Sequence, residues 1–108
     1  MQELRPIPVH TQLDVVRDAL QLARAADDVR VSGLSMDTRL VQSGDLFAAL
    51  PGAQTHGARY ASVAIERGAI AVLTDPAGAA LIDVQVPVLV VDDPRAHLGA
   101  LSCTIYPS

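Results

Sequence analysis

The sequence predicts one α/β domain of Rossmann-like type, with a mixed, largely parallel sheet flanked by helices. Short apolar runs alternate with segments of helical periodicity, and Pro or Gly residues mark most boundaries between them. Hydrophobic residues make up 50% of the 108 residues, which is ample for a packed core. Only 3% are aromatic, so the core must consist of Ala, Val, Leu and Ile. A chain of this length supports a single domain.

The first predicted elements are an amino-terminal arm and a helix. Residues 1–10 contain two prolines and no periodicity, which is typical of an arm. Thr11 can cap a helix that runs to about residue 25. Four apolar side chains recur at spacings of three and four and define one buried face: Leu13, Val16, Leu20 and Ala23.

Two strands and a turn follow. The alternation of Val29 and Val31 predicts a strand over residues 29–34. The Ser-Gly-Asp tripeptide at 43–45 predicts a turn. The continuous apolar run at 46–50 is typical of a strand buried on both faces, and a Pro-Gly pair ends it.

The second half repeats this alternation. A helix is expected over residues 58–67, with Gly68 as its left-handed cap. Two further strands are expected at 70–74 and 88–91, and we expect both of them, with 46–50, to be central and buried. A weak helix over 77–82 separates them. Asp93 and Pro94 are expected to cap and begin a last helix, whose buried face carries Leu98, Leu101 and Ile105.

Composition excludes several classes of partner. The net charge is −4 and no basic stripe is present, so nucleic acid is not an expected partner. No apolar run is long enough to span a bilayer, so no membrane association is expected. The single cysteine, Cys103, fits a reducing compartment and is expected to be a buried or half-buried thiol. We therefore expect a soluble, cytoplasmic protein, and a monomer.

Several catalytic devices are absent from the sequence. All eight basic residues are Arg, so a phosphate-binding loop that requires lysine cannot exist here. No Gly-x-Gly-x-x-Gly motif and no nucleophile elbow are present. The three histidines are far apart and show no metal-ligand spacing. No catalytic residue, metal site or cofactor is therefore predicted within this chain.

Two polar loops are the candidate ligand contacts, because ligands of open α/β sheets bind beyond the carboxyl ends of strands. In the first, Asp37 and Arg39 form a turn in which Asp37 caps amides and Arg39 pairs with a carboxylate, or else they contact a ligand. Thr38 offers a hydroxyl to a phosphate or sugar. In the second, His56 either caps the following helix or faces water, or it bonds to a ligand; the first reading is favoured. Met36 is expected to be partly buried.

Several sequence blocks, in the same order, resemble the amino-terminal domain of the Mur ligases, which extend the peptidoglycan stem peptide. Residues 33–39 (Gly-Leu-Ser-Met-Asp-Thr-Arg) are similar to the family's Asp-Ser-Arg segment, with the Thr38 hydroxyl retained. Residues 43–52 (Ser-Gly-Asp-Leu-Phe-Ala-Ala-Leu-Pro-Gly) match its Gly-Asp-Leu-Phe strand. The loop at 55–60 and the strands at 68–73 and 88–95 also match, so the resemblance covers roughly residues 29–106.

The resemblance implies a ligand and a reaction. It implies that residues 11–106 bind the uridine diphosphate end of a UDP-N-acetylmuramoyl peptide. The implied contacts are Met36, Thr38, Ala53, Gln54, Thr55 and His56, with Ala53 contributing only its backbone. The family reaction activates a carboxylate with ATP, and an amino acid amine then attacks the acyl phosphate. ATP and magnesium are expected in other domains, and residues 107–108 are interpreted as the start of the linker to them.

The resemblance leaves the family member open. The Pro-Gly-Ala-x-x-His-Gly loop favours the ligase that adds the third stem residue, diaminopimelate or lysine. The ligase that adds D-alanyl-D-alanine shares the other blocks and is the alternative. A free-standing α/β interaction domain without catalysis, which kept the fold and lost the ligase, is a further hypothesis, and the polarity of the two loops argues against it.

Overall fold

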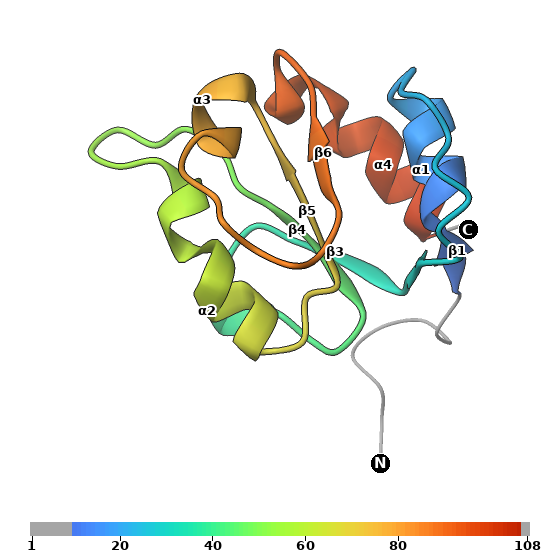
Figure 1. Ribbon diagram of the computed structural model, residues 1–108, viewed down its shortest axis with the longest axis horizontal. Coiled ribbons are helices and arrows are strands. Elements are labelled where there is room, and N and C mark those ends of the chain that lie inside the picture. The colour runs from blue at the N-terminus through green and yellow to red at the C-terminus, as the bar shows by residue number, and fades with distance from the viewer. Residues whose placement is uncertain (1–9, 107–108) are drawn as a thin grey trace.

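The structure is a computed structural model that describes residues 10–106. It is a three-layer α/β domain, as predicted, with a four-stranded parallel sheet between two layers of helices (Figure 1). The strands are β3 (Gly33–Ser35), β4 (Asp45–Ala48), β5 (Ala71–Thr74) and β6 (Val88–Val90), and they lie in this order in the sheet. The predictions for residues 1–9 of the arm and for residues 107–108 fall outside the described residues.

Parallel pairing fixes the register across the sheet. Leu34 lies opposite Leu46, which in turn lies opposite Ala71. Leu73 lies opposite Leu89. The only antiparallel pairing among the described strands forms a separate two-stranded sheet, in which β1 (Thr11–Gln12) pairs with β2 (Arg30–Val31). The sheet that carries the domain is thus wholly parallel rather than mixed.

Helices cover both faces of the sheet. α1 (Leu13–Ala19) and α4 (Leu98–Ile105) pack together on one side, and α2 (Ala61–Glu66) lies on the other (Figure 1). α3 (Pro76–Ala79) joins β5 to β6. Three 3₁₀ turns complete the fold and are named η1 (Thr38–Leu40), η2 (Gly57–Tyr60) and η3 (Pro94–His97).

The two faces of the central strands divide the core by the two-residue period of a strand. Leu46, Ala48 and Leu73 contact the layer of α1 and α4, where Leu13, Val16, Leu101 and Ile105 are buried. Phe47, Ala49 and Val72 point to the opposite face, toward the alanines of α2. A continuous apolar run is required because both faces of β4 and β5 are covered. The expectation that these two runs are central and buried is confirmed for residues 46–49 and 71–74, while Leu50 and Ile70 lie just outside the strands and are half-buried.

The prediction for residues 88–91 was wrong in one respect. β6 is an edge strand of the sheet, and the side chain of Val90 is exposed. Apolar composition alone does not distinguish an edge strand from a central one. The predicted strand at 29–34 is also divided, since β2 and β3 belong to different sheets and Ser32 separates them.

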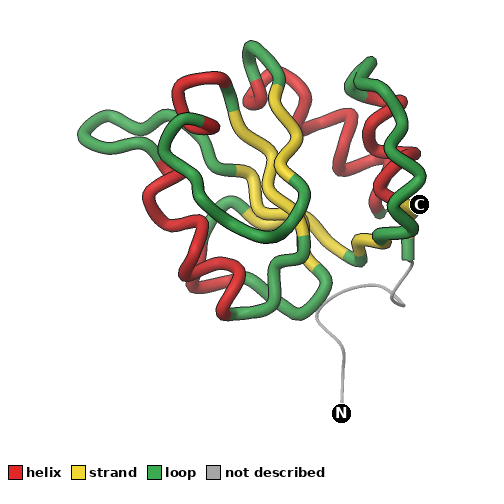
Figure 2. The backbone as a smooth tube through the Cα atoms, in the orientation of Figure 1, coloured by secondary structure: helices red, strands yellow, loops and turns green. Residues whose placement is uncertain are grey.

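The first helix is much shorter than its periodicity predicted. α1 ends at Ala19, and Gln21 has a positive φ of 60° that turns the chain out of the helix. Ala23 is exposed, and the segment from α1 to β2 is loop throughout (Figure 2). Thr11 lies in β1, and the N-cap residue Gln12 makes no side-chain cap bond, so the predicted cap is also wrong.

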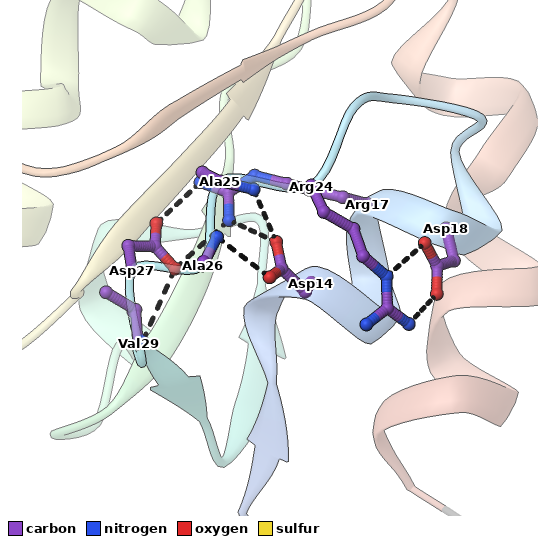
Figure 3. A network of polar contacts seen from close by, with 8 residues as sticks. All are labelled: Asp14, Arg17, Asp18, Arg24, Ala25, Ala26, Asp27 and Val29. Atoms are coloured by element: carbon purple, nitrogen blue, oxygen red, sulfur yellow. Dashed lines mark hydrogen bonds and ion pairs between the residues drawn. The ribbon is translucent and has the colours of Figure 1, made fainter.

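A polar network explains why the chain leaves the helix there (Figure 3). The Asp14 carboxylate accepts hydrogen bonds from the backbone N–H groups of Ala25 (2.9 Å) and Ala26 (3.0 Å). The buried Arg17 guanidinium bonds to Asp14 at 2.9 Å and to Asp27 at 2.7 Å. These contacts fold residues 21–28 back over α1, in place of the predicted continuation of the helix to about residue 25.

Other boundaries agree with the sequence or differ by a few residues. Gly68 has a φ of +118° after α2, as expected for a left-handed cap. Asp75 caps α3 by accepting from Gly78 N–H, but Asp93 makes no side-chain cap bond before η3. Cys103 is exposed, contrary to the expectation of a buried or half-buried thiol. Within residues 10–106 no helix combines the length and apolar character needed to cross a membrane.

Replacing Leu73 by Ala should destabilise the domain by about 2–5 kcal/mol, because the leucine is fully buried on a central strand. Urea unfolding of the two proteins measures the difference. A loss below about 1 kcal/mol would contradict the central position of β5.

The network around Arg17 should make stability depend on acidic pH. Backbone hydrogen bonds from Ala25, with the Arg17 side chain, lower the pKa of Asp14 below its ordinary value of 3.8. The Arg17 hydrogen bond lowers the pKa of Asp27 from the same value. A carboxylate whose pKa is lower in the folded state than in the unfolded state stabilises the fold at any pH above its unfolded-state pKa. This stabilisation is lost as the pH falls through the folded-state pKa.

The unfolding free energy should therefore fall below about pH 4 less steeply in Asp27→Asn than in the parent protein. Asp83→Asn is the matched control, since Asp83 is exposed and makes no ion pair among the described residues. Equal pH slopes for the parent and Asp27→Asn, measured by urea unfolding between pH 2 and 6 or so, would contradict the role of the network.

Candidate functional site

Two polar loops leave neighbouring strands at the same edge of the sheet. One loop follows β3 and the other follows β4, and parallel pairing of these strands brings their carboxyl ends together. The loop after β4 projects beyond the sheet edge (Figure 2). This is the position at which open α/β sheets bind their ligands.

The loop after β3 is shaped by Asp37. Its carboxylate accepts from Arg39 N–H at 2.9 Å and so caps η1. The Ser35 hydroxyl donates to the Asp37 carbonyl at 3.0 Å. The Arg39 guanidinium binds the Asp37 carboxylate with a shortest distance of 2.7 Å. The turn predicted for these residues is confirmed.

This ion pair also sets the charge of the loop. The Arg39 side chain, together with its backbone N–H, lowers the pKa of Asp37 to about 2. Asp37 is therefore ionised at neutral pH, and its charge is compensated by a guanidinium that is itself largely exposed. A phosphate that approaches the loop meets a neutral pair rather than an isolated carboxylate.

The loop after β4 is a tight reversal. Gly52 N–H donates to the Thr55 carbonyl at 3.1 Å, and Gly57 N–H donates to the Leu50 carbonyl at 2.8 Å. Pro51 and His56 form an isolated antiparallel bridge across the base of the reversal. Arg95 of η3 adds a contact from outside the loop, donating to the Pro51 carbonyl at 3.3 Å.

A cavity of about 480 Å³ lies between the two loops, within the usual range for small-molecule sites. It is lined by residues of both loops and of η2: Met36, Asp37, Thr38, Arg39, Phe47, Leu50, Gly52, Thr55, Gly57 and Tyr60. A second cavity of about 360 Å³ adjoins it, shares Met36 and Asp37, and extends to Tyr106 of the carboxyl-terminal segment.

Three of the sequence-predicted site residues line the larger cavity, namely Met36, Thr38 and Thr55. Met36 is 58% exposed, so the expectation that it is partly buried was wrong. Within residues 10–106, the Thr38 and Thr55 hydroxyls make no hydrogen bond, so both can serve a ligand. Ala53 and Gln54 are exposed on the same reversal but do not line the cavity.

His56 does not line this cavity. Its Nδ1 accepts from Ala58 N–H at 2.9 Å, which caps η2, and its Nε2 lies 2.8 Å from Oδ1 of Asp75. The Gly78 N–H hydrogen bond and then the His56 ring lower the pKa of Asp75 below its ordinary value. The capping role favoured from sequence is therefore present, and it is accompanied by a hydrogen-bond partner, Asp75, that sequence did not indicate.

The cavity also contains Tyr60, which sequence reasoning did not select, and Arg39, for which it left a ligand contact open beside its role in the turn. Tyr60 offers an aromatic ring that is 48% exposed, and Arg39 offers a cation. Both residues belong to sequence blocks that resemble the Mur ligases, so the resemblance could have indicated them as candidates. Their side chains could not be assigned to the cavity without knowing how the loops approach each other.

The site offers binding groups rather than reacting groups. Hydroxyls, backbone amides, an aromatic ring and one compensated arginine suit a polar ligand with a flat ring. Among the residues that the structure describes, no three His, Cys, Asp or Glu side chains gather to hold a metal ion.

Comparison with known proteins gives the family. The family described as "Mur ligase family, catalytic domain" matches residues 30–106. The chain is 47% identical over 104 residues to the UDP-N-acetylmuramoyl-L-alanyl-D-glutamate–2,6-diaminopimelate ligase of Streptomyces coelicolor, and 47% identical over 105 residues to that of Streptomyces avermitilis. Each match covers 94% of this chain but 21% of the relative, so the chain spans about a fifth of their length.

Solved structures agree on the fold. Two crystal structures of MurF from Acinetobacter baumannii superpose with a TM-score of 0.66 at 22% identity, covering 90% of this chain and 21% of theirs. The identity is too low to carry more than the fold. The matched residues include both loops, β3 to β6 and α4, and on these grounds the chain belongs to the Mur ligase family.

Proposed function

We propose that residues 11–106 form the domain that binds the uridine diphosphate end of a UDP-N-acetylmuramoyl peptide in a peptidoglycan-precursor ligase. The observation that carries the proposal is the cavity between the two loops, which is lined by Met36, Thr38 and Thr55. Both loops lie within the family match. The Thr38 and Thr55 hydroxyls, which have no hydrogen-bond partner among residues 10–106, suit phosphate or ribose oxygens. The exposed Met36 and Tyr60 suit the faces of a flat base.

The remaining proposed contacts lie on the same reversal. Ala53, Gln54 and His56 flank Thr55, and the Gln54 amide with the backbone amides is proposed to bind the part of the ligand that extends beyond the cavity mouth. The His56 side chain is bonded to Ala58 and Asp75, so its proposed contribution is to hold this reversal. Binding here is remote from the reacting carboxylate. Its contribution is to hold and place the substrate, which converts binding energy into orientation at the reacting centre.

We further propose that the parent enzyme adds the third stem residue, diaminopimelate or lysine. The identity of 47% to two diaminopimelate ligases over most of this chain favours this ligase over the one that adds D-alanyl-D-alanine. Both would hold the same nucleotide, so the proposed site serves either reaction. A cytoplasmic monomer fits the use of a nucleotide-sugar peptide.

ATP and magnesium belong to other parts of such an enzyme. The sequence has no lysine for a phosphate loop, and the described residues hold no cluster of metal ligands, so the residues present do not fit a magnesium–ATP site. In this proposal the chain contributes to catalysis only by positioning the substrate. A free-standing interaction domain is the competing hypothesis, and ligand binding distinguishes the two.

Thr38→Val should weaken binding of UDP or a UDP-muramoyl peptide by about 0.5–1.5 kcal/mol, or up to roughly 3 kcal/mol if the partner is a charged phosphate oxygen. Valine keeps the shape and removes the hydroxyl. Titration followed by amide chemical shifts in NMR measures the affinity and locates the ligand. Thr104→Val is the matched control, because its hydroxyl bonds only to the Ala100 carbonyl on α4.

If Thr38→Val and the parent protein bind UDP with equal affinity, the assigned site is wrong. So would shifts confined to α1 and α4, on the opposite side of the domain from the reversal after β4. Absence of any UDP binding would favour the free-standing interaction domain.

The 108-residue chain should show no ATP hydrolysis and no ligase activity by itself, because it lacks the groups that bind ATP. A phosphate-release assay with magnesium and UDP-muramoyl dipeptide checks this. Turnover that is abolished by a substitution within the chain would refute the prediction.

A further inference from the structure

The reversal after β4 is held by a side chain that does not touch the candidate cavity. His56 closes the reversal and directly follows Thr55, which lines the cavity. The imidazole is largely buried, with 11% of its side chain exposed, and Asp75 is similarly covered at 14%. Asp75 lies at the start of α3, nineteen residues further along the chain. The contact therefore joins the loop to a different crossover of the sheet.

Both ring nitrogens of His56 have hydrogen-bond partners. Nδ1 accepts from the Ala58 N–H, so it carries no proton. The Asp75 carboxylate accepts at 2.8 Å, so Nε2 carries the proton and donates it. One bond orients the ring relative to η2, and the other ties it to α3.

Asp75 is also held by a second hydrogen bond. Its Oδ1 also accepts from Gly78 N–H at 2.7 Å, which caps α3. A Cβ on Gly78 would lie 2.0 Å from Thr74 Oγ1 and 2.6 Å from His56 Cε1, so the imidazole occupies space that only glycine leaves open. The Thr74 hydroxyl donates to the Ala49 carbonyl at 2.9 Å, which joins β5 to the start of the same loop.

We propose that His56 and Asp75 are positioning residues that hold the reversal at 52–55 in place for the nucleotide. This inference rests on the proposed function. They act through Thr55 and the backbone amides rather than by contact with the ligand. Among the described residues, the Thr74 hydroxyl holds only the start of the loop, at Ala49, and the contact from Arg95 to the Pro51 carbonyl is long and exposed. Without the His56–Asp75 bond, the reversal can pivot away from Thr38 on the facing loop.

Two substitutions isolate the bond to Asp75. His56→Asn keeps an acceptor for the Ala58 N–H, as in an Asx turn, but is too short to reach Asp75. Asp75→Asn keeps an acceptor for Gly78 N–H but replaces the carboxylate that receives the imidazole proton. A third, Gly78→Ala, places a Cβ against both the Thr74 hydroxyl and the imidazole, so it perturbs both attachments of the loop to β5 and α3. Gly99→Ala is its matched control, since a Cβ there meets nothing within 4 Å.

The first measurement is amide hydrogen exchange of the ligand-free 108-residue chain. Exchange at Gly52 and Gly57 should be about fivefold faster or more in His56→Asn, Asp75→Asn and Gly78→Ala, because both amides depend on the closed reversal. Exchange at Leu73 in β5 should be unchanged, which shows that the sheet remains intact. Gly99→Ala should match the parent protein.

The second measurement is the affinity for UDP, at a temperature where each variant is fully folded. His56→Asn and Asp75→Asn should each weaken binding roughly three- to tenfold, the size of one lost orienting hydrogen bond. The double variant should be no weaker than either single variant, because both remove the same bond. Combination with Thr38→Val should be multiplicative, since Thr38 lies on the other loop.

The outcomes separate the two proposals. Unchanged exchange at Gly52 and Gly57 in His56→Asn and Asp75→Asn overturns the positioning role, whatever the ligand does. Faster exchange with an unchanged affinity also overturns it, provided that Thr38→Val weakens binding. Failure of the parent protein to bind UDP overturns the proposed function, and exchange in the ligand-free protein still decides whether His56 and Asp75 hold the loop.

Discussion

The parallel pairing of β4 with both β3 and β5 is the constraint on which the rest of the structure depends. It places Leu46 between Leu34 and Ala71, and so fixes which side chains reach each layer of helices. It also fixes where the chain leaves the sheet. Because all four strands run in the same direction, the loops after β3 and β4 emerge at one edge. The candidate cavity exists because of this register.

The first helix is shorter than its sequence suggested, and much of the chain is held instead by aspartate side chains that bind backbone N–H groups. Asp14, Asp37, Asp45 and Asp75 each accept at least one backbone N–H at a turn or helix start. Asp45 does so while fully buried within the sheet. An ionised carboxylate that accepts backbone hydrogen bonds forms a stronger contact than a neutral acceptor. Short elements joined by such contacts can therefore hold loops in defined positions.

The same device appears on both sides of the candidate site. Asp37 holds the turn that presents Thr38, and Asp75, through His56, holds the reversal that presents Thr55. At the first place the Arg39 guanidinium matches the charge of the Asp37 carboxylate, while at the second the Asp75 carboxylate is hydrogen-bonded by the imidazole and does not line the cavity. A domain of net charge −4 can thus face a diphosphate without an isolated negative group at the mouth of the cavity.

The sequence by itself determined the fold class, the family and the order of the elements, because apolar runs, Pro and Gly boundaries and the matched blocks are local signals. It also located Met36, Thr38 and Thr55, which the structure brings to one cavity. Tertiary structure alone decided that α1 ends at Ala19, since that depends on carboxylates that meet residues 25–27. It likewise decided that β6 is an edge strand and that His56 faces Asp75. Sequence periodicity reports which face of an element is apolar. Which polar group meets which depends on chain reversals that bring distant residues together, and no local pattern encodes that distance.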